Sequence, residues 1–270
     1  MRWHDGVFCR DEGGTMIKAA FFDIDGTLLS FKTHRMPEST KQALATLREK
    51  GILTIVSSGR PTYQLPPCIK TGFDAYITLS GQLCYDADGV FRSSPISKTG
   101  VASVVEQVKS GCYEALVLQG DRAFCSKLTD DVAEVARAAG LVYAPDDIDR
   151  TFDAPVYQFC AFLGQDREHI ITDAIPDVAT TRWTHLFCDI MPADGGKIHG
   201  VRAAFERYGI SPQEAIAFGD GENDLSMFEA VGTGVAMGNA WDTVKERADY
   251  VTTSVDDDGI WKACEHFGLL

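Results

Sequence analysis

The chain has 270 residues, of which 45% are hydrophobic, so it can bury a full core as one large domain or two smaller ones. It carries 25 basic and 39 acidic residues, a formal net charge of -14. Because nucleic acids and anionic membranes bind clustered lysine and arginine, this balance argues against both as partners. An anionic substrate is still compatible, since a positive site can form within a negative surface.

The eight cysteines are scattered, without a Cys-x-x-Cys pair or a compact spacing that would indicate zinc or a disulfide framework. This usage predicts reduced thiols in a cytoplasmic protein. No stretch approaches the roughly 20 apolar residues that cross a bilayer, and the N-terminus lacks the apolar core of a signal peptide. Residues 1–15 show no periodicity, and we expect them to be a leader outside the fold.

An apolar run at 17–22 leads directly into Asp23-Ile24-Asp25-Gly26-Thr27. Such a run predicts a central parallel strand, and ligands of open α/β sheets bind at the carboxyl ends of these strands. Side chains alternate along an extended segment, so both aspartates can face one site, where a carboxylate can act as a nucleophile. Asp-Gly pairs also form plain turns or begin calcium loops. The calcium loop fails on spacing, because its sixth position would be Leu28 instead of glycine.

Residues 38–50 have helical periodicity, and residues 51–57 form a second apolar strand that ends at Ser58-Gly59-Arg60-Pro61. Proline favours the first turn of a helix, and a turn of this kind offers a hydroxyl and backbone N–H groups to an anion. Taken alone, Ser58 is equally consistent with a plain helix cap.

The alternation of strands and helices that predicts a parallel sheet stops near residue 82 and resumes near 192. Between them we expect a hairpin at 83–92, helices near 98–109, 129–139 and 166–175, and strands near 113–118, 155–163 and 182–190. The core would then be discontinuous, residues 16–82 and 192–270, with an inserted α/β domain at 83–191 whose sheet is partly antiparallel. Such an insert can close over a substrate and carry selectivity. Arg182, Trp183, His185 and Asp189 are candidates, although an aromatic beside a strand is more often core.

Lys197 opens a segment with helical spacing, where its charge opposes the helix dipole, so a bound phosphate would explain it. A lone lysine at a helix start is otherwise usually solvated. A further apolar strand at 215–219 runs into Asp220-Gly221-Glu222-Asn223-Asp224. If this strand lies beside the first, Asp220 and Asp224 join an acidic cluster that needs a cation. Hard oxygen ligands beside a phosphate suit Mg²⁺.

The segments Asp23–Thr27, Ser58–Arg60, Lys197 and Gly219–Asp224, in this order, resemble the four motifs of the haloacid dehalogenase (HAD) superfamily of phosphatases. The similarity is closest to the Cof-type branch, whose C-terminal pattern matches Met237-Gly238-Asn239-Ala240 and Asp258-Gly259-Ile260. It covers nearly all of residues 16–270 and implies a Rossmann-like parallel-sheet α/β core with an inserted type IIB α/β cap. One departure is Leu79-Ser80-Gly81-Gln82, where this branch often has an Asn-Gly pair, which leaves the hinge or substrate edge undefined.

Carried over residue by residue, the resemblance implies that Asp23 attacks phosphorus and binds the metal. Asp25 would protonate the leaving oxygen, act as the base for hydrolysis and give its backbone carbonyl to Mg²⁺. Asp220 would be the third protein ligand, and Asn223 and Asp224 would orient the phosphate and the metal's waters. The expected phosphate-binding residues are Gly26, Thr27, Ser58, Gly59, Arg60, Lys197 and Asn223, and the expected metal-binding residues are Asp23, Asp25, Asp220 and Asp224.

The sequence therefore predicts a Mg²⁺-dependent phosphomonoester hydrolase that acts through a phosphoaspartate on a small phosphorylated metabolite, such as a sugar phosphate or a nucleotide-like cofactor. A sugar phosphomutase or phosphotransferase would use the same residues. A third possibility is a non-catalytic module that binds a phosphorylated ligand, although every residue needed for turnover is present. The expected partner is the small metabolite, without nucleic acid or membrane, and the sequence gives no indication of oligomeric state.

Overall fold

The computed structural model describes residues 16–138, 141–182 and 184–270, so the expected leader at 1–15 lies outside it. The chain divides into two compact units. The first consists of the described residues up to Ser58 with Pro66–Phe91 and Gly196–Leu270, and the second of Gly59–Leu65 and Arg92–Gly195. Within the described ranges, no helix has the length and apolar character needed to cross a membrane.

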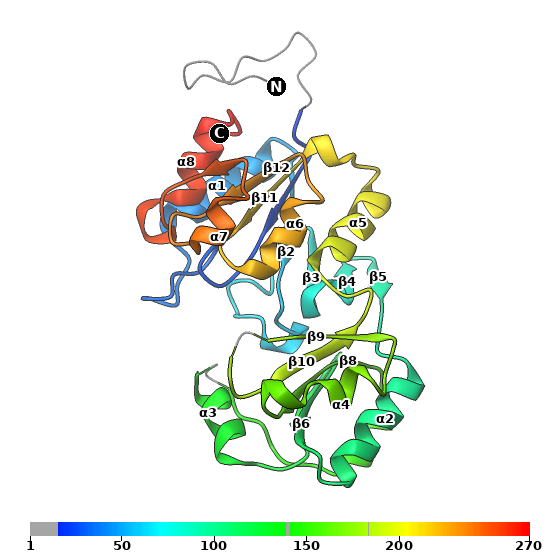
Figure 1. Cartoon of the computed structure of the whole chain (residues 1–270). Helices are drawn as coiled ribbons and strands as arrows, with labels where there is room; N and C mark the ends of the chain where they lie inside the picture. The colour runs from blue at the N-terminus through cyan, green and yellow to red at the C-terminus, as the bar shows by residue number, and fades with distance from the viewer. Residues whose placement is uncertain (1–15, 139–140, 183) are drawn as a thin grey trace. The chain divides into compact units, whose positions relative to one another are not determined.

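The first unit is built on an eight-stranded sheet (Figure 1). Its strands, in spatial order, are β13 (Tyr250–Val251), β12 (Thr233–Ala236), β11 (Ala215–Gly219), β1 (Ala19–Phe22), β2 (Leu53–Ser57), β3 (Ala75–Thr78), β4 (Leu83–Asp86) and β5 (Gly89–Ser93). Neighbours from β13 to β3 are parallel, and β4 pairs with β3 antiparallel. The strand order reverses at β1, and ligands of open α/β sheets bind at the carboxyl ends of the strands where such a reversal occurs.

The two central strands, β1 and β11, are buried along their whole length. Phe21 packs edge-on against Phe205 on one face of the sheet, whereas Phe22 stacks on Phe218. Because successive strand residues point to opposite faces, the two aromatic pairs lie on opposite faces of the sheet. The two apolar runs that lead into the acidic loops therefore form the middle of the core, as expected from the sequence.

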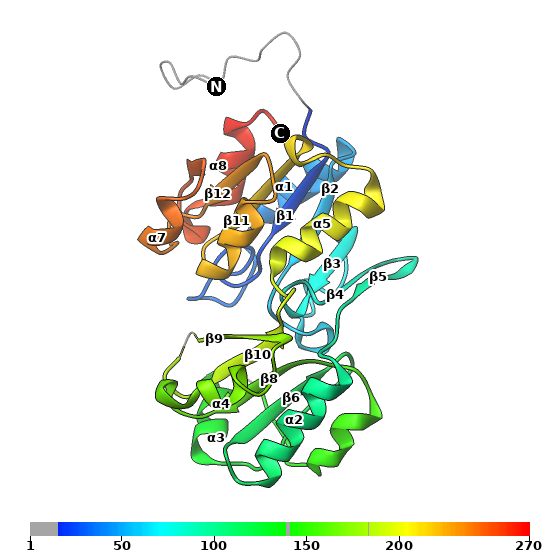
Figure 2. The ribbon, with the colours of Figure 1, turned by 45° about the vertical axis from the view of Figure 1, so that its right-hand side comes forward.

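Helices cover both faces of this sheet. Figure 2 shows α5 (Lys197–Tyr208) in front of the strands and α1 (Glu38–Glu49) behind them. α6 (Leu225–Phe228) joins α5, and α8 (Gly259–His266) packs on α1, while α7 (Asp242–Lys245) follows β12. This arrangement confirms the predicted α/β class with a parallel sheet, and the predicted helix at 38–50 ends within one residue of α1.

The second unit contains a five-stranded sheet in the order β7-β6-β8-β10-β9. Its strands are β6 (Glu114–Gln119), β7 (Ala123–Cys125), β8 (Val156–Phe162), β9 (Val178–Thr181) and β10 (Cys188–Pro192), and its helices are α2 (Lys98–Lys109), α3 (Asp130–Ala138) and α4 (His169–Thr172). Side chains of α2 and α4 pack with those of β6, β8 and β10 in one apolar cluster. This cluster is the core of the unit.

Several expectations for the insert differ from the structure. The pairings between its five described strands are all antiparallel, whereas a partly antiparallel sheet was expected. The expected helix at 166–175 shortens to a 3-10 turn and α4, and the expected strand at 182–190 is confined to β10. The hairpin at 83–93 extends the core sheet beside β3, so the boundary between the units falls at Phe91 and Gly196. The change of sequence pattern at residue 82 therefore does not mark the boundary between the units, because β4 pairs with the edge of β3.

Candidate active site

The two acidic loops leave the sheet side by side. Phe22 at the end of β1 is in register with Phe218 of β11, and the amide of Asp23 donates to the Phe218 carbonyl over 3.0 Å. Asp23 therefore begins at the same edge of the sheet at which β11 ends and Asp220 begins. The sequence predicted this juxtaposition from two apolar strands that each run into acidic residues.

Lys197 joins the loops through its ammonium group. Its Nζ lies 2.5 Å from Asp23 Oδ1 and 2.5 Å from Asp224 Oδ1, and its side chain is fully buried. Ligand atoms of Asp23, Asp220 and Asp224 lie within 4.8 Å of one another. The lysine at the start of α5 is thus not solvated, because two carboxylates compensate its charge at this helix end.

Hydrogen bonds within the second acidic loop hold these carboxylates in place. Asp224 Oδ2 accepts from the amides of Asp220 and Gly221, each over 2.9 Å, while its other oxygen faces Lys197. Thr27 is completely buried, and its hydroxyl donates to Asp220 Oδ1 over 2.9 Å. The hydroxyl of Thr27, expected to bind phosphate, is therefore engaged in positioning Asp220.

Gly26 is required by its conformation and by its surroundings. Its φ is +87°, in the region that favours glycine, and a Cβ at this position would lie 2.1 Å from Asp220 Oδ2. The same Cβ would lie 2.5 Å from the ring of Phe31. The absence of a side chain at Gly26 therefore keeps the space beside the Asp220 carboxylate clear.

The cluster has more negative than positive charge. Burial raises the pKa of Asp23 to about 8, and the nearby carboxylates of Asp224 and Asp220 add to this against the opposing effect of Lys197. Burial likewise raises the pKa of Asp220 to about 7, with Asp224 contributing. Burial alone would lower the pKa of Lys197, but Asp224 and Asp23 outweigh it, so its pKa is raised and it stays charged.

These properties fit a divalent cation. Three buried carboxylates with one ammonium group leave a net negative charge, and proton uptake by Asp23 and Asp220 is the alternative to binding a metal. Carboxylate oxygens are the ligands that Mg²⁺ prefers, and the glycine at 26 leaves room next to Asp220. The donor set thus suits a hard cation of small radius.

The other residues expected at the site are not members of the carboxylate cluster of Asp23, Asp220 and Asp224. Ser58 is buried at the end of β2, where its amide donates to the Ile77 carbonyl. Asn223 is exposed beside Gly221, and Asp25 lies outside the three-carboxylate cluster among the described residues. Gly59 and Arg60 belong to the second unit, where the Arg60 guanidinium donates to the Gln64 carbonyl over 3.2 Å.

The residues near the end of the insert that were expected to carry selectivity differ from one another in their contacts and exposure. Arg182 pairs with Glu168 over 2.6 Å and donates to the carbonyls of Thr184 and His185, so it holds the turn before β10. His185 is exposed, Asp189 is buried, and Trp183 lies outside the described residues.

Ser80, in the segment that departs from the expected Asn-Gly pair, joins two motif segments. Its amide donates to the Ser58 carbonyl, and its own carbonyl accepts from the amide of Gly196, each over 3.0 Å. Leu79, Ser80 and Gly81 all have positive φ, and a Cβ at Gly81 would lie 2.5 Å from the Gly196 carbonyl oxygen. This strained turn links the end of β2 to the residue before Lys197. In the sequence, only the glycine at 81 indicated such a turn.

Asn239 is a second positioning residue, and the sequence alone did not predict its role. Its Nδ2 donates to the Gly26 carbonyl over 2.8 Å and approaches Asp220 Oδ2 at 3.4 Å. Its Oδ1 accepts from the amide of Val255 over 2.9 Å. Asn239 therefore ties the first acidic loop to the second and to the C-terminal segment. Its signal in the sequence was a polar residue three positions after the end of the apolar strand β12.

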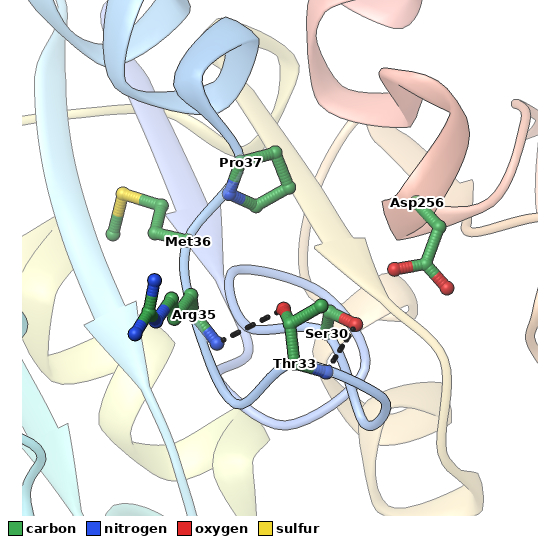
Figure 3. Close-up of a pocket in the computed structure, with 6 residues that line it drawn as sticks. All are labelled: Ser30, Thr33, Arg35, Met36, Pro37 and Asp256. Carbon is green, nitrogen blue, oxygen red and sulfur yellow. Dashed lines mark hydrogen bonds between the residues drawn. The ribbon is translucent and has the colours of Figure 1, made fainter.

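A surface depression of about 510 Å³ lies in the first unit and is lined by Ser30, Thr33, Arg35, Met36, Pro37 and Asp256 (Figure 3). Backbone amides hydrogen-bond to the hydroxyls of Ser30 and Thr33, which makes this a well-ordered turn. None of the clustered carboxylates lines the depression, so it is separate from the candidate active site.

The fold and the site together define a Rossmann-like hydrolase with an α/β insert and a phosphoryl-transfer type of site at the switch point of its sheet. The model of the haloacid dehalogenase-like hydrolases matches residues 20–264. YkrA of Bacillus subtilis strain 168 is 33% identical over 257 residues, which cover 94% of this chain and 98% of YkrA. The chain therefore belongs to the family of haloacid dehalogenase-like hydrolases.

Solved structures agree with this assignment. The phosphatase BT1666 from Bacteroides thetaiotaomicron aligns with a TM-score of 0.88 and 32% identity, over 96% of this chain and 98% of BT1666. The subclass IIB sugar phosphatase BT4131 aligns with a TM-score of 0.82 and 32% identity, over 94% of this chain and all of BT4131. The resemblance to HAD phosphatases and the type of core and insert expected from the motifs are confirmed.

Proposed function

We propose that the chain is a Mg²⁺-dependent phosphomonoester hydrolase that acts through a phosphoaspartate at Asp23. The observation that carries this proposal is the fully buried ammonium of Lys197, 2.5 Å from both Asp23 and Asp224, at the edge of the sheet where Asp220 also lies. A structural core would not assemble three carboxylates around one cation without a further positive charge. Phosphoryl transfer uses such an arrangement, because it depends on alignment and on charge stabilisation.

In the first step, a carboxylate oxygen of Asp23 attacks phosphorus, and the bond from phosphorus to the ester oxygen breaks. Asp25 gives its proton to that oxygen, and the alcohol leaves. In the second step, Asp25 takes a proton from water, the water oxygen attacks the phosphoaspartate, and inorganic phosphate and the Asp23 carboxylate are regenerated. Both steps use the same pair of carboxylates, with Asp25 alternating between acid and base.

The other residues position and neutralise the reacting groups. Lys197 supplies a fixed positive charge beside Asp23 for the phosphoryl oxygens, and Ser58 supplies a hydroxyl for them. Asp23, Asp220 and the backbone carbonyl of Asp25 would hold Mg²⁺, which when bound supplies positive charge that stabilises the transferring phosphoryl group. Asp224 acts by orienting Lys197 and the amides of its loop, since both its oxygens already accept hydrogen bonds.

The substrate that we propose is a small phosphorylated metabolite, with a sugar phosphate as the first choice. The name of BT4131 describes it as a sugar phosphatase, and it aligns over nearly all of this chain. The second unit, Gly59–Leu65 and Arg92–Gly195, is the proposed selectivity domain, because the proposed catalytic carboxylates and lysine all belong to the first unit.

The test is phosphate release from p-nitrophenyl phosphate and from hexose phosphates, with and without Mg²⁺. Metal-dependent release by the unmodified protein, lost in Asp23→Asn, is the expected result. If the products are positional isomers of the sugar phosphate instead of free phosphate, the reaction is phosphoryl transfer between hydroxyls and not hydrolysis. No turnover together with tight binding of a phosphate ester would instead point to a binding module.

A further inference from the structure

The residues that follow β13 in the first unit form a loop closed by its own hydrogen bonds. In this loop, Thr252–Gly259, here called the C-terminal segment, the Thr252 hydroxyl donates to the Gly259 carbonyl over 2.7 Å. The Gly259 amide in turn donates to the Ser254 carbonyl over 3.1 Å. The C-terminal segment contributes no carboxylate to the cluster of Asp23, Asp220 and Asp224, but its backbone is held in one conformation.

The turn after β12 lies directly on the C-terminal segment. The Gly238 amide donates to the Thr253 carbonyl over 3.0 Å, and a Cβ at Gly238 would lie 2.6 Å from the Ser254 amide nitrogen. The next residue, Asn239, accepts through its Oδ1 from the Val255 amide over 2.9 Å. Because a backbone amide can only donate, this contact determines which end of the Asn239 side chain faces the segment. The Val255 amide therefore orients Asn239.

The other end of the Asn239 side chain reaches two groups beside the carboxylate cluster. Its Nδ2 donates to the Gly26 carbonyl over 2.8 Å and approaches Asp220 Oδ2 at 3.4 Å. An amide nitrogen carries two protons, so it can serve both acceptors. Since Asp220 Oδ1 accepts from the Thr27 hydroxyl, Asn239 and Thr27 hold the two oxygens of this carboxylate separately.

Gly26 lies between two peptide groups that are each fixed by a hydrogen bond. Its amide donates to the Leu29 carbonyl over 2.8 Å, which fixes the planar peptide that also carries the Asp25 carbonyl. Its own carbonyl belongs to the next peptide, which Asn239 fixes. In the proposed function, the Asp25 carbonyl and the Asp220 carboxylate would both hold the metal. Asn239 thus acts on the surroundings of both groups through a single side chain.

A second contact joins the C-terminal segment to the residues that follow the first acidic loop. Lys32 Nζ lies 2.8 Å from Asp256 Oδ2, and the Lys32 ammonium together with the Ser30 hydroxyl holds the pKa of Asp256 below its ordinary value. Ser30 and Asp256 line the same surface depression (Figure 3). The Lys32 side chain is 79% exposed, and exposed ion pairs contribute little. The contact through Asn239 is therefore the one that connects the segment with the carboxylate cluster.

We propose that Asn239, oriented by the backbone amide of Val255, is a positioning residue that sets the affinity of the carboxylate cluster for Mg²⁺. This inference rests on the proposed function for the identity of the metal. Without the Val255 amide, the Asn239 side chain is free to turn, and the Gly26 carbonyl and Asp220 Oδ2 lose their shared donor. Hydrogen bonds that orient metal ligands in this way typically change metal affinity 10–100-fold.

Three variants separate the two ends of this connection. Asn239→Ala removes both the donor and the acceptor. Val255→Pro leaves Asn239 in place and removes the amide proton that orients it. A proline suits this position because Val255 is the first residue of a 3-10 turn and Ser254 before it is extended, with φ of -66° and ψ of 163°. Val255→Ala is the matched control, because it shortens the same buried side chain but keeps the amide.

The measured quantity is the Kd for Mg²⁺, from calorimetric titration of the protein without substrate. The Kd should rise about 10–100-fold in Asn239→Ala and about 3–10-fold in Val255→Pro, and it should stay unchanged in Val255→Ala. The double variant Asn239→Ala/Val255→Pro should bind Mg²⁺ no more weakly than Asn239→Ala, because the Val255 amide acts only through Asn239.

Melting temperatures without metal distinguish positioning of the metal site from a purely structural role. A lower melting temperature of Asn239→Ala together with an unchanged Kd would assign Asn239 to the fold and overturn the proposal. Equal rises of Kd in Val255→Pro and Val255→Ala would assign the effect to packing and also overturn it. Losses that multiply in the double variant would show that the Val255 amide acts independently of Asn239, which contradicts the proposed connection.

Metal binding without substrate keeps the inference independent of turnover. A protein that shows the expected pattern of Kd values but releases no phosphate from any ester would support the role of Asn239, while the proposed hydrolysis fails. Mg²⁺-dependent phosphate release by the unmodified protein, with an unchanged Kd in Asn239→Ala, would overturn the inference and leave the proposed hydrolysis standing.

Discussion

Replacing Lys197 with methionine removes the buried cation while keeping a side chain of similar length. The two carboxylates that it contacts at 2.5 Å are then left without their counter-charge in a fully buried place. Breaking a buried ion pair on one side costs about 3–5 kcal/mol. For a chain of this size, that corresponds to a melting temperature lower by roughly 6–20 °C. The loss should be larger at pH 8 than at pH 5, because Asp23 can take up a proton at the lower pH and relieve the repulsion.

The matched control is Lys18→Met. Lys18 Nζ also lies 2.5 Å from a carboxylate oxygen, Glu214 Oε1, but its side chain is 51% exposed. Exposed pairs are screened by water, so this variant should melt close to the unmodified protein. Differential scanning calorimetry without metal measures both shifts, and turnover of Lys197→Met should fall about 10²–10³-fold, as for the loss of one oxyanion donor. A Lys197→Met protein that melts no lower than Lys18→Met would show that burial does not strengthen the ion pairs of Lys197.

The other predictions concern the metal and the loops around it. Stabilisation by Mg²⁺ should grow from pH 5 to pH 8. The raised pKa values of Asp23 and Asp220 stabilise the metal-free fold in full below their ordinary value of 3.8, and this contribution is lost progressively as pH rises to about 7 to 8. Equal metal-induced shifts in melting temperature at both pH values would contradict this. Gly26→Ala should lower the free energy of unfolding by about 1–2 kcal/mol, because alanine disfavours the left-handed conformation. It should also abolish Mg²⁺ binding, because its Cβ would meet Asp220. Retained Mg²⁺ affinity in a calorimetric titration would contradict this. Thr27→Val should weaken Mg²⁺ binding about 10–100-fold by releasing Asp220, and calorimetry with an unchanged Kd would exclude that role.

Much of the first unit was predictable because its signals are local. Apolar runs such as Ala19–Phe22 and Ala215–Gly219 predicted central strands, and acidic residues at their ends meet at one edge of a parallel sheet if the two strands lie side by side. Lys197 at a helix start, against the dipole, predicted a bound phosphate as its partner, whereas its partners in the structure are the carboxylates of Asp23 and Asp224.

The parts that the sequence did not predict depend on contacts between distant segments. Nothing local shows that Ser80 bridges Ser58 and Gly196, since its positive φ is set by the hydrogen bonds on either side. Asn239 is likewise defined by three partners far from it in sequence. In the insert, edge strands as short as β7 and β9 leave too little periodicity to be recognised, and the helix expected at 166–175 is longer than α4.

In the proposed reaction, Asp23 carries the phosphoryl group during turnover. Rapid acid quench of the enzyme with a hexose phosphate and Mg²⁺, followed by proteolysis and mass spectrometry, detects this group. We expect a phosphorylated peptide whose modified residue is Asp23, formed within the first turnover and absent without Mg²⁺. Steady release of phosphate with no phosphorylated peptide, or with the group on another residue, would rule out Asp23 as the nucleophile.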